Sequence, residues 1–286
     1  MPSDNAIFVE SFSPRGLLAA DEPAPFEICN REGKTPLVLT CDHASAFIPR
    51  RLQSLGLDEA AMARHIAWDI GIADVTRHLA RRLDAVAVLS NFSRLVIDPN
   101  RQLGTPSSIV EVSDGVTIPG NRDLSQEAID LRVETFFKPY HEAVRQAIET
   151  RLSGETLPAL IAMHSFTPLM EGVQRPWQIG VLWNRDPRLP LPLIEKLRRH
   201  GLTVGDNEPY SGRDGHGYSQ HRHGDERGLA NALIEVRQDL IDTHQGGEHW
   251  SALLASVFTE VLREPGLYRP WSDHPGFNAT GADQSR

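Results

Sequence analysis

Short, uninterrupted apolar runs alternate with helix-like segments along this chain, and this alternation constrains the fold more than any other feature. The clearest run covers residues 36–41, PLVLTC, in which apolar side chains follow one another without the spacing of a half-exposed strand. Continuous runs are typical of strands buried on both faces of a parallel sheet. The same reasoning predicts further strands at residues 85–89, 94–98, 158–163, 179–183, 202–204 and 233–236.

Helical segments are predicted between these strands. They cover residues 58–83, 125–152, 191–200 and 248–262, and Pro139 is expected to distort the second of them. Strands that alternate with helices predict a single α/β sandwich around a mixed, largely parallel sheet. We expect an irregular lead-in at residues 1–33, one domain at 34–265 and a loosely held tail at 266–286, with long polar loops at 101–123 and 205–228.

Composition excludes several classes of protein. The formal net charge of −9 argues against a nucleic-acid-binding protein, which needs clustered Lys and Arg. No apolar run approaches the ~18 residues of a membrane helix, and the first residues lack a basic and then apolar leader, so we expect a cytoplasmic protein. With 12 His but 2 Cys, a disulfide scaffold is excluded, and Cys29 and Cys41 lack the spacing of a thiolate zinc site.

Polar and charged residues follow most of the predicted strands. In open α/β sheets, ligands bind beyond the carboxyl ends of the strands, so these residues are expected to converge on one site. They are Asp42-His43, Asp98-x-Asn100-Arg101, His164-Ser165, Asn184-Arg185 and Glu235-x-Arg237.

Two of these residues, His43 and His164, are candidate metal ligands. A hydrolytic zinc site takes three protein ligands from His and acidic residues and leaves a fourth position for water. Asp69 is one candidate for the third ligand, since the predicted helix places it on the same face as His65. Asp42 is the alternative, although it is equally suited to orient a ligating imidazole from behind.

Other strand-end residues suit substrate chemistry. Glu235 is either a general base beside a metal-activated water or a partner of Arg237 in a surface ion pair. The guanidinium of Arg101 matches a carboxylate in two hydrogen bonds, and Arg94 has the same capacity. Within the Gly- and His-rich segment 212–224, His223 is the best candidate for a substrate contact.

Several long polar motifs resemble the N-formylglutamate amidohydrolase family. They are LVLTCDHASAFIP, HIAWDIG, SRLVIDPNR, IPGN, KPYH, IAMHSFTP, RPWQIGVLWN, VGDNEPY and IEVRQDLI, spread over residues 37–241. That family is similar to the zinc carboxypeptidase and aspartoacylase group. The resemblance implies a three-layer α/β/α sandwich, zinc-exopeptidase-like, with a mixed sheet.

The resemblance also implies a reaction and a set of residues. A single Zn²⁺, or another divalent metal, would be held by His43, Asp69 and His164, and Glu235 would be the base that helps to cleave an N-acyl amino acid. Asn100 and Arg101 would bind the carboxylate of this small anionic substrate, assisted by Arg94 and Arg237. The peptidase group has an acid three residues after its first His. Here Ala44-Ser45-Ala46 follow His43, so the second ligand is expected from elsewhere, at Asp69.

Two other functions remain open on the sequence. A metal-independent hydrolase would use Ser165 or Cys41 as nucleophile, but the G-x-S-x-G elbow is absent. A non-catalytic protein on the same scaffold would bind a carboxylate through Arg101 without turnover.

Overall fold

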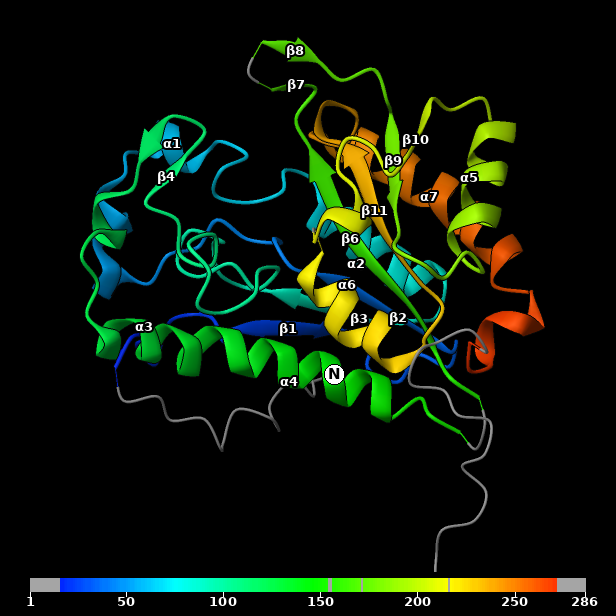
Figure 1. Cartoon of the computed structure of the whole chain (residues 1–286), viewed down its shortest axis with the longest axis horizontal. Helices are drawn as coiled ribbons and strands as arrows, with labels where there is room; N and C mark the ends of the chain where they lie inside the picture. The colour runs from blue at the N-terminus through cyan, green and yellow to red at the C-terminus, as the bar shows by residue number, and fades with distance from the viewer. Residues whose placement is uncertain (1–15, 154–155, 171, 216, 272–286) are drawn as a thin grey trace, which may run out of the picture.

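A seven-stranded mixed sheet forms the centre of the molecule in a computed structural model that describes residues 16–153, 156–170, 172–215 and 217–271 (Figure 1). The strand order is β1 (Phe26–Cys29), β3 (Val86–Ser90), β2 (Leu37–Cys41), β6 (Ala159–Phe166), β11 (Asn231–Arg237), β9 (Ile179–Leu182) and β10 (Val204–Asp206). The four strands from β3 to β11 are parallel, whereas β1 runs antiparallel to β3 and β9 antiparallel to β11. The predicted mixed, largely parallel sheet is confirmed.

Helices cover both faces of this sheet (Figure 1). One face packs against α2 (Ile72–Arg82), α5 (Pro190–Arg199) and α7 (His244–Val261), and the other against α4 (Lys138–Glu149) and α6 (Tyr218–His223). Burial of β2 on both of its faces explains why its apolar run is continuous. Leu37 and Leu39 belong to the first core, whereas Val38 between them belongs to the second. The α/β/α sandwich is therefore as predicted.

The single helix predicted over residues 58–83 is wrong. The structure has a short helix α1 (Glu59–Met62) and the separate helix α2, with turns at residues 63–71 between them. Two long-range contacts explain the break. The Asp69 amide donates to the His43 carbonyl at 2.9 Å, and Gly71, at φ 80°, lies so close to Ile241 that a Cβ would meet its carbonyl oxygen at 2.2 Å. Tertiary contacts thus override helix periodicity here.

The strand predicted at residues 94–98 is also wrong. This segment forms turns, in which the Val96 amide donates to the Ser93 carbonyl at 2.9 Å and the Arg101 amide to the Asp98 carbonyl at 3.2 Å. Leu95 and Val96 are both buried, but in two different core clusters. Their apolar character therefore reflects burial on two sides of a turn.

The predicted helix at 125–152 is present as three consecutive parts. Ser125 accepts a hydrogen bond from the Ala128 amide and caps α3 (Gln126–Arg132). A π-helical turn, η3 (Val133–Phe137), follows directly and leads into α4, whose second residue is Pro139. The expected distortion is thus a wider turn immediately before the proline, as is common where a helical hydrogen bond is missing.

The long loops carry short elements of their own. Two small hairpins, β4 (Val112–Ser113) with β5 (Val116–Thr117) and β7 (Leu169–Met170) with β8 (Val173–Gln174), stand apart from the central sheet in Figure 1. Short 3₁₀ turns are η1 (Arg50–Gly56), η2 (Pro119–Asn121), η4 (Gly212–Asp214), η5 (Asp225–Arg227), η6 (Gln238–Leu240) and η7 (Pro265–Tyr268).

The described parts of the N-terminal lead-in and of the C-terminal tail differ from the prediction. Strand β1 lies within the lead-in that was expected to be irregular, and it pairs along the edge of the sheet through backbone hydrogen bonds that need no apolar pattern. At the other end, Leu267 is buried in the core, so the predicted loose tail is packed at this position. The rest of the tail, residues 272–286, lies outside the described residues. In the described part of the chain, no helix has the length and apolar composition needed to cross a bilayer.

Candidate active site

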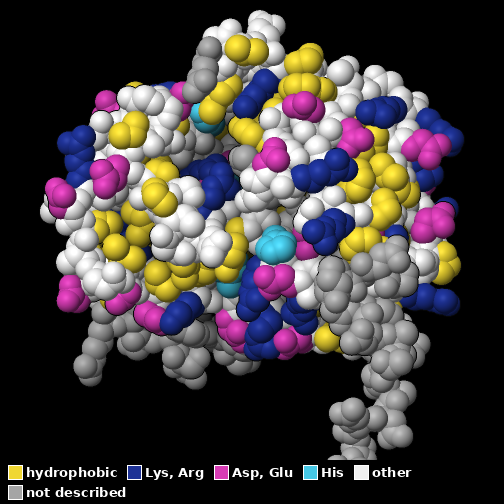
Figure 2. All heavy atoms as spheres, viewed as in Figure 1, with side chains coloured by type: hydrophobic (Ala, Val, Ile, Leu, Met, Phe, Trp, Pro, Cys, Tyr) yellow, Lys and Arg dark blue, Asp and Glu magenta, His cyan; other side chains and the backbone are white. Residues whose placement is uncertain are grey.

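A cavity of about 250 Å³ opens beside the carboxyl ends of β2, β6 and β11. Figure 2 shows dark-blue Lys or Arg side chains within a hollow on this side of the molecule. The lining residues are His43, His65, Ile66, Asp69, Arg94, Asn100, Arg101, Ser113, Asp114, His164, Ser165, Phe166, Thr167, Met170, Leu182, Tyr210, Gly217, Leu233 and Glu235. The structure therefore brings together most of the strand-end residues that the sequence singled out.

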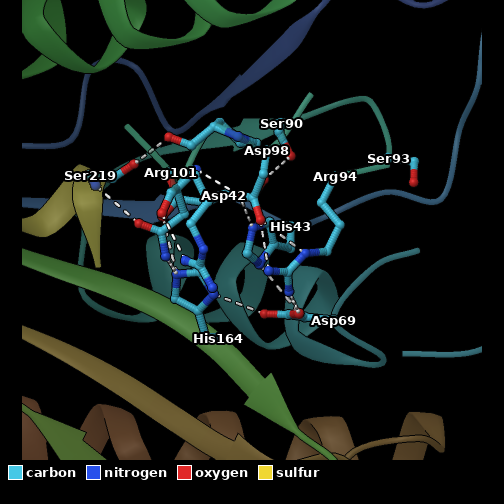
Figure 3. Close-up of polar contacts among 12 residues, drawn as sticks. Asp42, His43, Asp69, Ser90, Ser93, Arg94, Asp98, Arg101, His164 and Ser219 are labelled. Atoms are coloured by element: carbon cyan, nitrogen blue, oxygen red, sulfur yellow. Dashed lines mark hydrogen bonds and ion pairs between the residues drawn. The ribbon is translucent and has the colours of Figure 1, made fainter. Parts of the chain in front are cut away.

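His43 follows β2 by two residues and is 2% exposed. Its Nε2 lies 2.8 Å from Asp98 Oδ1, and the other oxygen of Asp98 accepts from Arg94 Nη2 at 2.7 Å. Figure 3 shows this arrangement, with Asp98 between the imidazole and the guanidinium. The Nε2 atom of His43 is thus paired with the Asp98 carboxylate. The Nδ1 atom of the same ring is on the side of Asp69.

His164 lies within β6, since this strand runs three residues beyond its predicted end. Its Nδ1 is 2.9 Å from Asp69 Oδ2, and its Nε2 is 3.1 Å from Asp42 Oδ2. The other Asp42 oxygen accepts from the Tyr140 hydroxyl at 2.6 Å. Asp42 therefore contacts the nitrogen of His164 that faces away from Asp69.

Asp69 contacts both imidazoles (Figure 3). Its Oδ1 is 3.4 Å from His43 Nδ1, while its Oδ2 accepts from the Ser165 amide at 3.2 Å as well as contacting His164. One donor atom from each of His43, Asp69 and His164 lies within 4.8 Å of the others, and all three residues are buried. These three form a compact donor set from three separate parts of the chain.

The charges of this cluster stabilise one another. Burial opposes ionisation of Asp42, but the His164 imidazole outweighs it and lowers the pKa of Asp42 to about 2. The same balance, with His43 as the main favourable partner, lowers the pKa of Asp69, and Arg94 does so for Asp98. Burial likewise opposes protonation of His164, yet Asp42 and Asp69 raise its pKa to about 10.

The donor set fits a divalent metal ion. His43 Nδ1 and Glu235 Oε2 are buried polar atoms without a hydrogen-bond partner among the described residues, which is rare in a protein interior. In addition, each imidazole contacts a carboxylate through Nε2, the usual arrangement behind a metal-ligating His. Two His nitrogens and one carboxylate are a common ligand set of catalytic zinc.

Glu235 lies on β11 directly beside His164, its register partner on β6. Its side chain is almost fully buried in the cavity wall, and burial raises the pKa of Glu235 to about 7. The sequence left open an ion pair with Arg237, but that side chain binds Asp239, with Nε 2.8 Å from Oδ1, and does not line the cavity. Glu235 is therefore available for chemistry, and Arg237 lies away from it.

Asn100 and Arg101 reach the cavity from the turn after Asp98. Asn100 is buried and fixed, since its Oδ1 accepts from the Ser219 amide at 3.0 Å and its Nδ2 lies 3.5 Å from His164 Nε2. Arg101 Nη1 donates to the Asn100 carbonyl at 2.9 Å. Among the described residues, Arg101 forms no salt bridge, although its charge contributes to the lowered pKa of Asp98.

The structure does not place His223 in the cavity. Its ring stacks on His141 with centroids 5.2 Å apart, and its Nε2 is 2.9 Å from His141 Nδ1. His141 Nε2 donates to the Pro99 carbonyl at 2.9 Å, which makes His141 Nδ1 the acceptor and His223 Nε2 the donor. The buried pair is neutral, and burial lowers the pKa of His141 to about 4 and that of His223 to about 3.

This neutral pair predicts an acid-sensitive stability. Both imidazoles have a lower pKa in the folded chain than the ordinary value of 6.5, so the unfolded chain binds more protons between about pH 4 and 6.5. Stability is therefore lost as the pH falls through this window. The nearby charges of Asp42, Arg222 and Arg227 act on the same pair.

Replacing His223 by Gln is expected to reduce this loss by ~3 kcal/mol or less, measured by urea unfolding at pH 7 and at pH 4.5. The matched control is His249→Gln, which changes an exposed His on α7. Equal pH dependence in the wild type and His223→Gln would contradict the prediction.

Sequence reasoning missed two functional candidates and under-used a third. Tyr140, which binds Asp42, and Tyr210, which lines the cavity, received no role, although both occur in motifs quoted above, KPYH and VGDNEPY. Asp98 was noted only as a strand-end residue. An aromatic residue within a polar motif was the one signal available for the tyrosines.

The fold is an α/β sandwich with a cavity lined by His and acidic side chains beside the carboxyl ends of its parallel strands. The N-formylglutamate amidohydrolase family model matches residues 35–242, and the chain belongs to this family. It is thus an amidohydrolase-family enzyme, as the sequence resemblance implied.

Two solved structures are similar to this chain. The gene product Atu2144 from Agrobacterium tumefaciens is 32% identical, with a TM-score of 0.84, over 87% of this chain and 98% of that one. The N-formylglutamate amidohydrolase from Ralstonia eutropha JMP134 shares the fold at 19% identity, with a TM-score of 0.62, over 84% of this chain and 98% of that one. No curated protein matches the sequence.

Proposed function

We propose that this enzyme is a metal-dependent amidohydrolase that cleaves the amide bond of an N-acyl amino acid such as N-formylglutamate. The observation that carries the proposal is the donor set of His43, Asp69 and His164 beside the unpartnered carboxylate of Glu235. Family membership supports amide hydrolysis as the reaction class.

The three proposed ligands would hold one divalent ion, with Zn²⁺ the ion best suited to two imidazoles and a carboxylate. Such an ion supplies Lewis-acid polarisation of an amide carbonyl and lowers the pKa of water. Asp42 and Asp98 orient the two imidazoles through their Nε2 atoms. On this reading Asp42 supports a ligand, and Asp69 is the third ligand.

Glu235 is the proposed general base. Its carboxylate takes a proton from the attacking water as the carbon–oxygen bond forms, and returns that proton to the leaving nitrogen as the carbon–nitrogen bond breaks. The products are a carboxylic acid and a free amino acid. A buried carboxyl group with a pKa near 7 exchanges a proton in both directions near neutral pH.

Arg101 is the proposed receptor for the substrate α-carboxylate, because its guanidinium forms no salt bridge among the described residues and can bind a carboxylate through two hydrogen bonds. Asn100 adds an amide at the same turn. Arg94 forms a salt bridge with Asp98, and its Nη1 lies 3.7 Å from Asp69 Oδ1. We therefore assign to Arg94 the role of stabilising the charged cluster on the side that faces the substrate.

The metal-independent alternative finds little support. The Ser165 hydroxyl donates to the Ile70 carbonyl at 2.9 Å, so its proton is held by a backbone oxygen and not by an imidazole base. The Cys41 thiol is fully buried, and burial raises its pKa well above the usual range. A thiol in that state is a poor nucleophile.

A metal-exchange assay tests the proposal. The purified enzyme is expected to lose hydrolysis of N-formyl, N-acetyl or longer N-acyl amino acids after chelation and dialysis, and to regain it with one equivalent of Zn²⁺. Metal analysis before and after each step gives the stoichiometry. Full activity in a metal-free preparation would refute the metal, and tight carboxylate binding without turnover of any substrate would favour the non-catalytic alternative.

A further inference from the structure

A second cavity, with a volume of about 360 Å³, lies beside α3, which is at the lower left in Figure 1. It is bounded by α3, η1, η2 and the chain at Leu17, and it shares no lining residue with the candidate active site. Most of its wall is apolar, and this part consists of Leu17, Leu52, Leu55, Leu124, Ala128 and Leu131. We call it the α3 cavity, and its wall suits the hydrocarbon part of a ligand.

Arg132, the last residue of α3, brings a buried guanidinium to this wall and is 2% exposed. Its Nη1 donates to the Val96 carbonyl at 2.8 Å and to Asn121 Oδ1 at 2.7 Å, and its Nη2 donates to the Gly120 carbonyl at 3.0 Å. The Nε–H group has no hydrogen-bond partner among the described residues, and Nε is not one of their fully enclosed unpaired atoms. This N–H group is therefore free to bind a ligand in the α3 cavity.

The charge of Arg132 has no counter-ion in the part of the chain that the structure describes. All three of its hydrogen-bond acceptors are neutral oxygens. Burial alone lowers the pKa of Arg132 to about 10, since no acidic side chain acts on it, so the guanidinium is still charged at neutral pH. Buried charges in proteins are ordinarily paired, because an unpaired charge is costly to remove from water. An anion in the α3 cavity would supply the missing partner.

Arg51 gives the α3 cavity a second cationic group. Its side chain is exposed and donates to the Gly16 carbonyl, and it forms no salt bridge with any described residue. The acidic side chains of the neighbouring segment, Asp21 and Glu22, pair with Arg50 instead. The α3 cavity thus combines an apolar wall with two arginines that lack acidic partners.

We infer that the α3 cavity is a binding site for a small amphipathic carboxylate, an unbranched saturated chain of a few carbons that ends in one carboxylate group. The carboxylate accepts from Arg132 Nε, with Arg51 as the second cation, because a guanidinium matches the planar carboxylate. The hydrocarbon chain packs among the leucines and leaves water. The site is separate from the candidate active site, so the inference does not depend on the proposed function.

Isothermal titration calorimetry of the full-length protein with hexanoate, butyrate and hexanol tests the inference. Hexanoate is expected to bind, and its affinity is expected to exceed that of butyrate by about fourfold for each additional methylene. Hexanol has no charge and is expected to bind at least about 10-fold more weakly than hexanoate. Because Arg101 can also bind a carboxylate, the titration is repeated with Arg101→Met, in which hexanoate is expected to bind as in the wild type.

Two tryptophan variants locate the bound hexanoate. Ala128→Trp fills the α3 cavity from a half-buried position on α3 and leaves Arg132 and its hydrogen bonds in place, so it is expected to abolish hexanoate binding. Glu127→Trp is the matched control, because Glu127 is exposed on the same helix and does not line the α3 cavity. This control is expected to bind hexanoate as the wild type does.

Substitution of the arginines tests the charge. Arg132→Met is expected to weaken hexanoate binding about 10- to 100-fold. Arg51→Met is expected to weaken it about fivefold or less, since this side chain is exposed. Should Arg132→Met fail to fold, the two tryptophan variants decide the question.

Three results would overturn the inference. The first is a full-length protein that does not bind hexanoate. The second is hexanol binding as tight as hexanoate binding. The third is hexanoate binding that is lost in Arg101→Met but kept in Ala128→Trp, which would place the carboxylate in the candidate active site.

Discussion

Replacing His164 by Ala is expected to remove tight metal binding and amide hydrolysis together. His164 supplies one of the three proposed ligands, and it also contacts Asp42 and Asp69, which hold the cluster together. Loss of a residue that only supports a ligand costs ~10–100-fold in metal affinity or activity, so loss of a ligand itself is expected to exceed ~100-fold in both. The measurements are Zn²⁺ titration against a competing chelator and kcat/KM of the loaded protein.

His65→Ala is the matched control for this variant. His65 lines the same cavity, but its Nε2 is paired with Asp114 at 3.6 Å and it lies outside the donor set. We expect it to keep stoichiometric metal, and circular dichroism of both variants establishes that they fold. A His164→Ala enzyme that binds Zn²⁺ as tightly as the wild type would show that the ligand assignment is wrong.

Replacing Glu235 by Gln is expected to lower kcat by ~10²–10⁴-fold while the metal is retained. Gln has the shape of Glu but accepts no proton in the relevant range, so the change removes the proposed proton transfer. The substitution also removes a carboxyl group that burial makes costly to ionise, and the fold is therefore expected to tolerate it. Metal content and single-turnover rates separate this effect from loss of the ion.

Glu248→Gln gives the control, because Glu248 is on α7, does not line the cavity and pairs with Arg82 at 2.9 Å. It is expected to leave kcat unchanged. A near-normal rate for Glu235→Gln would refute its role as base. Loss of metal in that variant would instead make Glu235 a ligand.

Most of the fold could be predicted because each of its buried strands shows a continuous apolar pattern in its own sequence. The run at β2 is apolar on successive residues since Val38 and its neighbours face opposite cores, and this is visible without any knowledge of the partner strands. The segment at residues 94–98 shows the limit of the same signal. Its centre, residues 95–97, is also a continuous apolar run, yet it is buried as a turn, and only its long-range surroundings distinguish the two outcomes.

The residues of the candidate site, like the fold, could be predicted in part from the sequence. His43, His164 and Glu235 were found from the sequence because polar residues at the carboxyl ends of parallel strands meet at one edge of a sheet. Arg101 also lines the cavity, although the segment before it is a turn and not the predicted strand. The direction of each side chain was not predictable in this way. Arg237 lies on the same strand as Glu235 but binds Asp239, and His223 packs against His141 and does not line the cavity.

By itself, then, the sequence determined the layered sheet and the identity of most polar groups at the edge that forms the cavity, since both follow from local patterns along single strands. Only the tertiary structure decided which acidic residue contacts both imidazoles. Asp42 is next to His43 in sequence, but it faces the far side of His164, whereas Asp69 reaches both rings from a turn. That turn exists because the Asp69 amide donates a hydrogen bond to the His43 carbonyl. This contact joins two separate segments of the chain, and no local periodicity in the sequence predicts it.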